Sequence, residues 1–262
     1  MGNPIAHSLS PRIHQAFARQ TGQSLDYQAV LVPEDAFAET LTAFQEAGGK
    51  GANITLPFKE VAWRTVTVRT ARAERAGAVN TVWFEAATIY GDNTDGIGLV
   101  RDLRDNLGCE LNGKRVLILG AGGAVRGVIE PLFDAGVADI VIANRTPAKA
   151  EVIATQFADR GLIRAEAYDD LEAAFPIIIN GTSLSLQQEL PPLGDGVLAE
   201  GGWVYDMMYQ REPTCFMHWA AEHGAERTAD GLGMLVEQAA EAFAIWRGVR
   251  PETTPVINML RH

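Results

Sequence analysis

Polar and charged side chains gather in short stretches of the first hundred residues, where predicted strands end and loops begin. These residues are Ser8, Ser10, Asn53, Thr55, Lys59, Asn80 and Asp95. Each of them alone is typical of a helix cap or a solvated loop, and Ser10 before Pro11 has the pattern of an N-cap. Together they suit a small polyhydroxylated acid, because every hydroxyl and carboxylate oxygen of such a ligand needs a placed partner.

A second stretch has the pattern of a dinucleotide site. Residues 115–119 predict a strand that runs directly into Gly120-Ala121-Gly122-Gly123, and an amphipathic helix follows. The glycines let the backbone approach a pyrophosphate, and the helix N-terminus offers unpaired N–H groups. Val125 stands where the G-x-G-x-x-G pattern has its third glycine, so a glycine-rich turn without a ligand stays an alternative.

The end of the next predicted strand, residues 139–143, bears on which nucleotide would bind. An NAD site places an acidic residue against the ribose 2′-hydroxyl, whereas an NADP site accommodates the phosphate with Arg. This chain has Asn144, Arg145 and Thr146 there, then Lys149, and no acid. The sequence therefore favours NADP over NAD, with a solvated helix face as the alternative.

The periodicity predicts an α/β protein with mainly parallel sheets, because helical patterns alternate with short β-branched runs almost throughout. In the first part, we expect helices at residues 10–22 and 34–47 and strands at 27–32, 51–55, 79–84 and 88–91. A second α/β unit begins near Gly96. Its strands are expected at residues 115–119, 139–143, 176–180 and 203–207.

The composition narrows the class of protein. The chain has 262 residues with 22 Lys or Arg and 33 Asp or Glu, and its net charge of −11 argues against nucleic acid and anionic membranes. Two cysteines and five scattered histidines provide neither a disulfide framework nor a metal site. No apolar run reaches the roughly 18 residues of a membrane span. We expect a soluble, cytoplasmic monomer or homodimer that binds a small molecule.

Motifs in a fixed order extend along nearly the whole chain. They are NPIAHSLSP (3–11), KGANITLPFK (50–59), GAVNT (77–81), GDNTDG (91–96), GAGGAVRG (120–127), NRT (144–146) and ADGLGML (229–235). Together they resemble the motifs of the shikimate dehydrogenase family. The resemblance implies the reversible NADPH-linked reduction of 3-dehydroshikimate to shikimate, a step of aromatic amino-acid biosynthesis.

The resemblance also implies a domain organisation. Residues 1–95 plus 232–262 would form an α/β substrate-binding domain with a mainly parallel sheet. Residues 96–231 would form a Rossmann-like NADP-binding domain, with a cleft between the two.

Roles for individual residues follow from the same resemblance. Ser8 and Ser10 would bind the substrate carboxylate, supported by Tyr209. The ring hydroxyls and the reacting oxygen would be surrounded by Thr55, Lys59, Asn80, Asp95 and Gln238, and Asn53 would also bind the substrate. NADP would be held by Gly120, Ala121, Gly122, Gly123, Ala124, Asn144, Arg145, Thr146 and Lys149, with Met207 and Gly231 lining the nicotinamide pocket. For Gln238, a hydrogen bond to neighbouring backbone is the alternative.

Lys59 and Asp95 are the expected catalytic residues. The carbonyl oxygen that receives hydride at its carbon develops negative charge and must gain a proton. A cationic Lys59 can supply both the proton and the electrostatic stabilisation. A surface salt bridge between Lys59 and Asp95 is the alternative.

Two departures from the family pattern keep other functions open. Family members usually have an apolar strand before the first motif, whereas Met1 here adjoins Gly2, and we favour a misplaced start. Residues 60–78 are rich in Val and Thr, which weakens the helix that the family pattern places there.

Two alternative functions stay open. One is a quinate/shikimate dehydrogenase that uses NAD, and the other is a degenerate paralogue that binds its ligand without turnover.

Overall fold

A computed structural model describes residues 1–261, which divide into two compact units. Unit 1 comprises Met1–Gly98 and Leu235–His262, and unit 2 comprises Leu99–Met234. The boundaries therefore fall after residues 98 and 234, compared with 95 and 231 in the motif-based division. Within the described residues, no helix is both long and apolar enough to cross a membrane.

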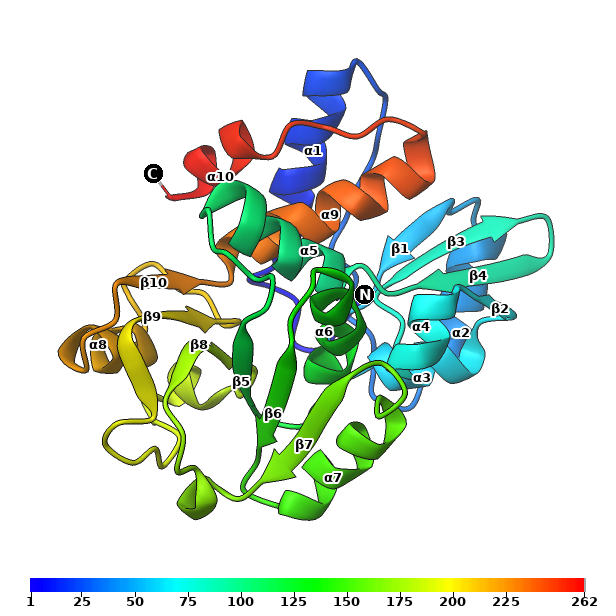
Figure 1. Cartoon of the computed structure of the whole chain (residues 1–262). Helices are drawn as coiled ribbons and strands as arrows, with labels where there is room; N and C mark the ends of the chain where they lie inside the picture. Colours follow the sequence, from blue (N-terminus) through cyan, green and yellow to red (C-terminus); the bar gives the residue numbers. More distant parts are fainter. Residues whose placement is uncertain (262) are drawn as a thin grey trace. The chain divides into compact units, whose positions relative to one another are not determined.

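Unit 1 contains a four-stranded sheet in the order β1-β3-β4-β2 (Figure 1). Its strands are β1 (Gly51–Asn53), β2 (Val68–Arg69), β3 (Thr81–Glu85) and β4 (Thr88–Asp92). Its helices are α1 (Ser10–Thr21), α2 (Phe37–Glu46), α3 (Lys59–Thr65), α4 (Ala71–Ala76) and α10 (Thr254–Arg261). Helices α5 (Asp95–Arg101) and α9 (Leu232–Arg247) each span a unit boundary.

The sheet of unit 1 is mixed, which corrects the expectation of a mainly parallel sheet in this domain. Strand β3 pairs antiparallel with both β1 and β4, and only β2 and β4 pair in parallel. Two residues separate β3 from β4, too few for the crossover that parallel neighbours need. Over both sheets the expectation is confirmed, because every pairing of unit 2 is parallel.

The first three residues supply backbone partners to two neighbouring segments. The Gly2 N–H donates to the Val30 carbonyl, and the Val32 N–H donates to the Gly2 carbonyl. On the other side, the Thr55 N–H donates to the Met1 carbonyl at 3.0 Å. In place of the strand expected at residues 27–32, the structure has one parallel bridge, between Gly2 and Leu31.

Residues 60–78 form two short helices instead of one. Val66 ends α3 in an extended conformation, and the β-branched residues after it pair with β4, through Thr67 N–H to the Ile89 carbonyl. Thr70 then caps α4 by accepting from the Ala73 N–H. Crowding at the branched Cβ favours this extended interval within an otherwise helical segment.

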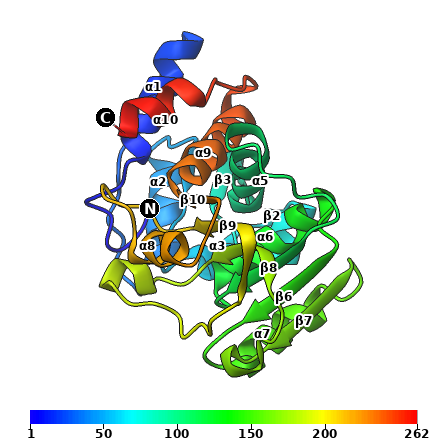
Figure 2. The ribbon, with the colours of Figure 1, turned by 60° about the vertical axis from the view of Figure 1, so that its left-hand side comes forward.

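Helices α1, α9 and α10 form a separate layer of unit 1. Figure 2 shows α1 beside α10, so the first and last helices of the chain are neighbours. Their shared core includes Ile13 and Phe17 from α1, Phe243 from α9 and Val256 from α10. The layer fixes α9, and with it Gln238, in unit 1.

Unit 2 contains a six-stranded parallel sheet in the order β10-β9-β8-β5-β6-β7 (Figure 1). Its strands are β5 (Arg115–Leu119), β6 (Asp139–Ala143), β7 (Leu162–Glu166), β8 (Phe175–Asn180), β9 (Leu198–Asp206) and β10 (Arg227–Asp230). Its α-helices are α6 (Gly123–Asp134), α7 (Pro147–Gln156) and α8 (Cys215–Glu222). Numbered along the chain, the strands have the order 3-2-1-4-5-6 of a dinucleotide-binding fold.

Shorter turns of helix connect these elements. They are η1 (Asp102–Asn106), η2 (Tyr168–Asp170) and η3 (Leu184–Gln187). The central strands are apolar on both faces, since Ile118 and Ile140 face one core cluster while Leu119 and Val141 face another. Such two-sided burial is typical of a parallel sheet covered by helices.

A compensating contact explains the missing third glycine of the turn after β5. The Val125 side chain is fully buried, and its Cγ2 lies 2.5 Å from the position that a Cβ on Gly181 would occupy. In the usual pattern a glycine on the helix allows close packing. Here the glycine lies on the opposite segment, so α6 packs closely with a valine in place.

We expect Gly181→Ala to lower the free energy of unfolding by about 1–3 kcal/mol, because the added methyl group would clash with the stiff Val125 side chain. Combining it with Val125→Ala should cost less than the sum of the two single changes, with a coupling energy of about 1 kcal/mol. Urea unfolding of the four proteins measures this. Gly194→Ala is the matched control, since a Cβ there meets no atom within 4 Å. If the losses of unfolding free energy in the two single variants simply add in the double variant, the close contact between Val125 and Gly181 does not explain the missing glycine.

Candidate active site

Lys59 and Asp95 form an ion pair in unit 1, each from the first turn of a helix. Lys59 begins α3 and Asp95 begins α5. The Lys59 Nζ lies 2.6 Å from the Asp95 Oδ2, and the two side chains are 18% and 6% exposed. This burial excludes the interpretation as a solvated surface salt bridge. The helix dipole favours the carboxylate at its position and disfavours the ammonium, so Asp95 is the partner that stabilises Lys59 there.

Asn80 holds Asp95 in place. Its side chain is buried, its Nδ2 donates to the Asp95 Oδ1 at 2.8 Å, and its Oδ1 accepts from the Thr94 N–H at 2.9 Å. The Asn93 Oδ1 accepts from the Asp95 N–H at 3.1 Å. With the carboxylate oriented in this way, Lys59 uses one of its three N–H bonds for Asp95 and can direct the others to a ligand.

Gln238 of α9 adjoins the same group. Its Nε2 donates to the Leu235 carbonyl at 2.8 Å, which is the backbone contact considered as its alternative role. Its Oε1 accepts from the Thr94 hydroxyl and from the Asn80 Nδ2, both at 3.3 Å. The side chain therefore belongs to the cluster around Asp95 as well.

Asn53 makes four hydrogen bonds within the protein. Its Oδ1 interacts with the Tyr27 hydroxyl at 2.8 Å and with the His14 Nε2 at 3.0 Å. Its Nδ2 donates to the Asn80 carbonyl at 3.3 Å and to the Thr81 hydroxyl at 3.2 Å. An amide side chain has two acceptor and two donor positions, so this arrangement leaves none for a ligand. It favours a supporting role over the substrate contact expected for Asn53.

The Tyr27 hydroxyl, which donates to this amide, is buried near the candidate carboxylate-binding serines. Burial raises the pKa of this tyrosine above its usual range, and the Ser10 side chain acts in the opposite direction. The Ser8 hydroxyl accepts from the Ser10 N–H at 3.3 Å. Ser10 is the first helical residue, and Leu9 takes the N-cap position without a side-chain bond. Hydrogen bonds thus link Tyr27 to Asn53, Asn53 to the Asn80 carbonyl, the Asn80 side chain to Asp95, and Asp95 to Lys59.

The remaining candidate of unit 1, Thr55, lies two residues beyond β1 and is partly exposed. Its carbonyl accepts from the Phe58 N–H, so it forms the turn that leads into α3 and Lys59. The candidate residues of unit 1 thereby come from the ends of β1 and β4, the position before β3, the starts of α1, α3 and α5, and the interior of α9.

The glycine-rich turn of unit 2 has open space at Gly122. Gly120 has a φ of +103°, a conformation that suits glycine, and its N–H donates to the Ala143 carbonyl at the end of β6. A Cβ on Gly122 would meet no atom within 4 Å. Helix α6 then begins at Gly123 without a side-chain cap, so the N–H groups of its first turn, which includes Ala124, are available to a phosphate. Ala121 packs against the core.

The stretch after β6 presents two cations. The Asn144 Nδ2 donates to the Thr146 carbonyl at 2.9 Å, which shapes the turn before α7. Arg145, Thr146 and Lys149 are exposed. Thr146 precedes the helix but its side chain makes no capping bond. Within residues 1–261, neither Arg145 nor Lys149 forms an ion pair, and this leaves both cations available to an anionic group.

Met207, Tyr209 and Gly231 lie at the carboxyl ends of β9 and β10. A Cβ on Gly231 would stand 2.2 Å from the Met207 carbonyl oxygen, so only glycine fits there. The Gly231 N–H donates to the Met208 carbonyl at 3.0 Å. Tyr209 is half-buried, which raises the pKa of its hydroxyl. The structure thus brings Met207 and Gly231 together.

Several supporting residues were absent from the sequence-based set. They are His14, Tyr27, Thr81, Asn93 and Thr94. Thr81 lies inside the GAVNT motif, and Asn93 and Thr94 lie inside the GDNTDG motif, so the motifs did contain a signal for these three. His14 comes three residues after the first motif ends. Tyr27 lies outside every motif.

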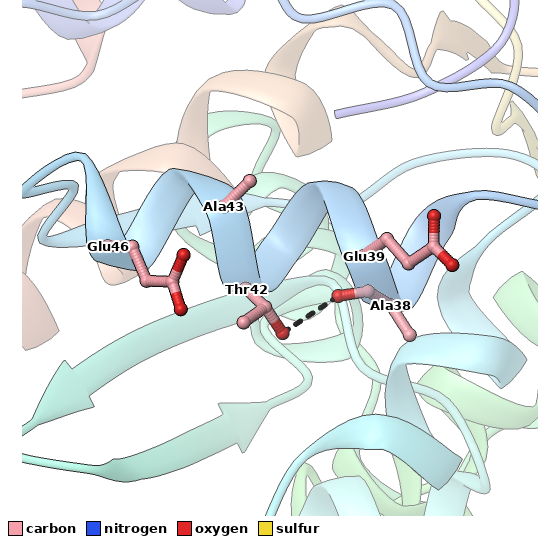
Figure 3. A pocket seen from close by; sticks show the side chains of 5 residues that line it. All are labelled: Ala38, Glu39, Thr42, Ala43 and Glu46. Atoms are coloured by element: carbon pink, nitrogen blue, oxygen red, sulfur yellow. Dashed lines mark hydrogen bonds between the residues drawn. The ribbon is translucent and has the colours of Figure 1, made fainter.

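An open depression on α2 contains none of these residues. Figure 3 shows its lining by Ala38, Glu39, Thr42, Ala43 and Glu46, with the Thr42 hydroxyl bonded to the Ala38 carbonyl at 3.0 Å. Two carboxylates and no cation line it, which does not suit an acidic ligand.

Three family models match the chain. They are the shikimate dehydrogenase substrate binding domain at residues 1–82, shikimate / quinate 5-dehydrogenase at residues 102–187, and the shikimate 5′-dehydrogenase C-terminal domain at residues 231–261. Among curated proteins, the shikimate dehydrogenase (NADP(+)) of Alkalilimnicola ehrlichii is 57% identical, with 100% of this chain and 97% of the relative covered.

Solved structures agree with the family models. An Ael1 enzyme from Pseudomonas putida is 48% identical with a TM-score of 0.95, covering 100% of this chain and 96% of that one. Shikimate 5-dehydrogenase from Thermus thermophilus, in complex with NADP(H) and shikimate, is 33% identical with a TM-score of 0.89, covering 99% and 96%.

His14 gives the supporting network a pH dependence. Burial lowers the pKa of this imidazole from 6.5 to about 3. Because the unfolded chain takes up the proton at higher pH, the stability that neutral His14 contributes is present above pH 6.5 and is lost as the pH falls toward 3. Between pH 7 and pH 5, we expect the wild type to lose about 2 kcal/mol more than His14→Gln. Urea unfolding at both pH values measures this, and equal losses would contradict it.

Proposed function

The chain belongs to the shikimate dehydrogenase family, and from that premise we propose that it catalyses the reversible NADPH-linked reduction of 3-dehydroshikimate to shikimate. The observation that carries the proposal is the largely buried Lys59–Asp95 pair, oriented by Asn80 at the junction of three family motifs. A cation held in this way can protonate a carbonyl oxygen as the oxygen becomes negative.

The residues of unit 2 fit NADP. The space over Gly122 admits a pyrophosphate to the backbone, and the uncapped start of α6 supplies N–H donors. Arg145 and Lys149 would hold the 2′-phosphate, and Met207 with Gly231 would border the nicotinamide. When bound, NADPH supplies the hydride.

The residues of unit 1 would bind and protonate the substrate. Ser8 and Ser10 would receive the carboxylate, while Thr55 and Gln238 would contact ring hydroxyls. Tyr209, a residue of unit 2, keeps its predicted role of supporting the carboxylate. Lys59 holds the proton on Nζ and gives it to the carbonyl oxygen in the direction of reduction. In the reverse direction, neutral Lys59 takes the proton from the shikimate hydroxyl. Asp95 orients the Lys59 side chain, and Asn80 holds Asp95 in place.

We further propose that the enzyme acts in the cytoplasm, as a monomer or a homodimer. Its two cysteines, Cys109 and Cys215, are both free thiols, as is usual in a reducing compartment. Size-exclusion chromatography with light scattering measures the number of subunits.

Replacing Lys59 tests the chemical assignment. We expect Lys59→Ala to lower kcat for NADPH oxidation with 3-dehydroshikimate by about 10²- to 10⁴-fold, because the proton donor and its charge are both removed. The KM for NADPH should change little. Lys50→Ala is the matched control, since this exposed lysine precedes β1 and has no assigned role. Wild-type turnover in Lys59→Ala would exclude the assignment, and circular dichroism verifies that the variant is folded.

Replacing the cations after β6 tests the choice of cofactor. In Arg145→Ala/Lys149→Ala, we expect the preference for NADPH over NADH, expressed as a ratio of kcat/KM values, to fall by about 100-fold, near 1.4 kcal/mol for each cation. Arg227→Ala, at the start of β10, should leave the ratio unchanged. If the ratio is unchanged in the double variant, Arg145 and Lys149 do not bind the 2′-phosphate and are solvated surface residues. Parallel assays with quinate test the alternative substrate.

A further inference from the structure

Asp206 is a buried carboxylate of unit 2 that the proposed mechanism does not use. It is the last residue of β9, and none of its surface is exposed. Its Oδ1 accepts from the Asn180 Nδ2 and from the Met208 N–H, both at 3.1 Å, and its Oδ2 accepts from the Thr214 hydroxyl at 2.7 Å. The Ser185 hydroxyl also hydrogen-bonds it. A carboxylate with this many donors has a defined orientation.

Two of these bonds join the ends of one loop to the same side chain. Residues 207–214 connect β9 to α8 and contain Met207 and Tyr209. The Met208 N–H contacts Asp206 near the start of the loop, and the Thr214 hydroxyl contacts it at the end. Thr214 is also the N-cap of α8, where its Oγ1 accepts from the Met217 N–H at 3.2 Å. The carboxylate therefore closes the loop at its base.

Asn180 extends the closure to the neighbouring strand. Its Nδ2 donates to Asp206, while its Oδ1 accepts from the N–H of Thr182 at 3.0 Å and from the hydroxyl of Thr182 at 2.7 Å. Thr182 in turn approaches the turn after β5, since its Cγ2 lies 3.1 Å from where a Cβ on Gly120 would be. One connected group of polar side chains thus lies beneath both the loop and the glycine-rich turn.

Burial of this carboxylate opposes its ionisation. Removal from water raises the pKa of Asp206, and the bonds from Ser185, Thr214, Met208 and Asn180 act in the opposite direction. An apolar residue at the end of β9 would avoid this cost, but it could not bind the two ends of the loop.

We propose that Asp206 and Thr214 are positioning residues that fix the loop 207–214, and through it set where Met207 and Tyr209 stand to receive the two ligands. The proposal rests on the proposed function for the identity of the ligands. Neither residue is assigned a contact with substrate or cofactor, so both act through the loop.

Substitutions of Thr214 test the proposal without removing the buried Asp206 carboxylate. Thr214→Val removes the hydroxyl at nearly constant volume, and Thr214→Ser keeps it. We expect Thr214→Val to raise the KM values for shikimate and for NADP by about 3- to 10-fold, with kcat changed less than about 3-fold, since each ligand loses only part of its binding energy. Thr214→Ser should restore both values to within about 2-fold of the wild type. Asp206→Asn, which perturbs more bonds, should raise them further.

Two readouts do not depend on turnover. Amide hydrogen exchange at Met208 should accelerate by about 10-fold or more in Thr214→Val, because its acceptor on Asp206 becomes mobile. The Kd for NADPH, measured by its fluorescence on binding, should rise together with the KM. Both results can support the loop proposal even where the wild-type protein fails to reduce 3-dehydroshikimate, a failure that would overturn only the proposed function.

Asp139→Asn is the matched control. Asp139 begins β6, at the opposite end of the same sheet from the end of β9, and pairs with Arg115 and Arg164. This variant should leave both KM values and Met208 exchange unchanged, whatever its effect on Tm. The proposal is overturned if Thr214→Val lowers Tm but leaves the KM values, the NADPH Kd and the exchange of Met208 at wild-type levels.

Discussion

The largely buried pair of Lys59 and Asp95 constrains how unit 1 is built. Either ion alone would lose several kcal/mol of hydration on burial, so the two must meet and the carboxylate needs further donors. Strand β3 follows Asn80 and strand β4 leads into Asn93 and Asp95, and the hairpin register that pairs Thr81 with Asp92 brings these residues side by side. The antiparallel hairpin of β3 and β4 is therefore what brings the partners of the carboxylate together.

The two units use a similar arrangement of an asparagine and a carboxylate, with Asn80 directly before β3 and Asn180 at the end of β8. In unit 1, the Asn80 side chain donates to Asp95 and accepts from the backbone N–H of Thr94. In unit 2, the Asn180 side chain donates to Asp206 and accepts from the backbone N–H of Thr182. An amide can do both because it carries a donor and an acceptor on one rigid plane. Each amide joins a buried carboxylate to a turn, which orients the polar groups that follow the strand.

Sequence patterns predict the buried strands better than the edges. Strands β5 and β6 have the predicted bounds, 115–119 and 139–143, since both are apolar on two faces. Strands β7 and β10 were missed because they lie at the two edges of the sheet. Strand β7 carries Arg164 and Glu166, and its first residue, Leu162, is 71% exposed. Edge strands face solvent and carry charges that blunt their pairing, so the apolar signal is absent.

The role of a polar residue depends on how many hydrogen-bonding positions the fold leaves open, and sequence does not contain that number. Asn53 belongs to a motif, yet Tyr27 and His14, at separations of 26 and 39 residues, take both positions of its oxygen. Lys59 keeps N–H bonds to spare, because a single carboxylate cannot use all three. Residue type therefore predicts which groups can do chemistry, while the completed network divides them into those that bind a ligand and those that hold the binders in place.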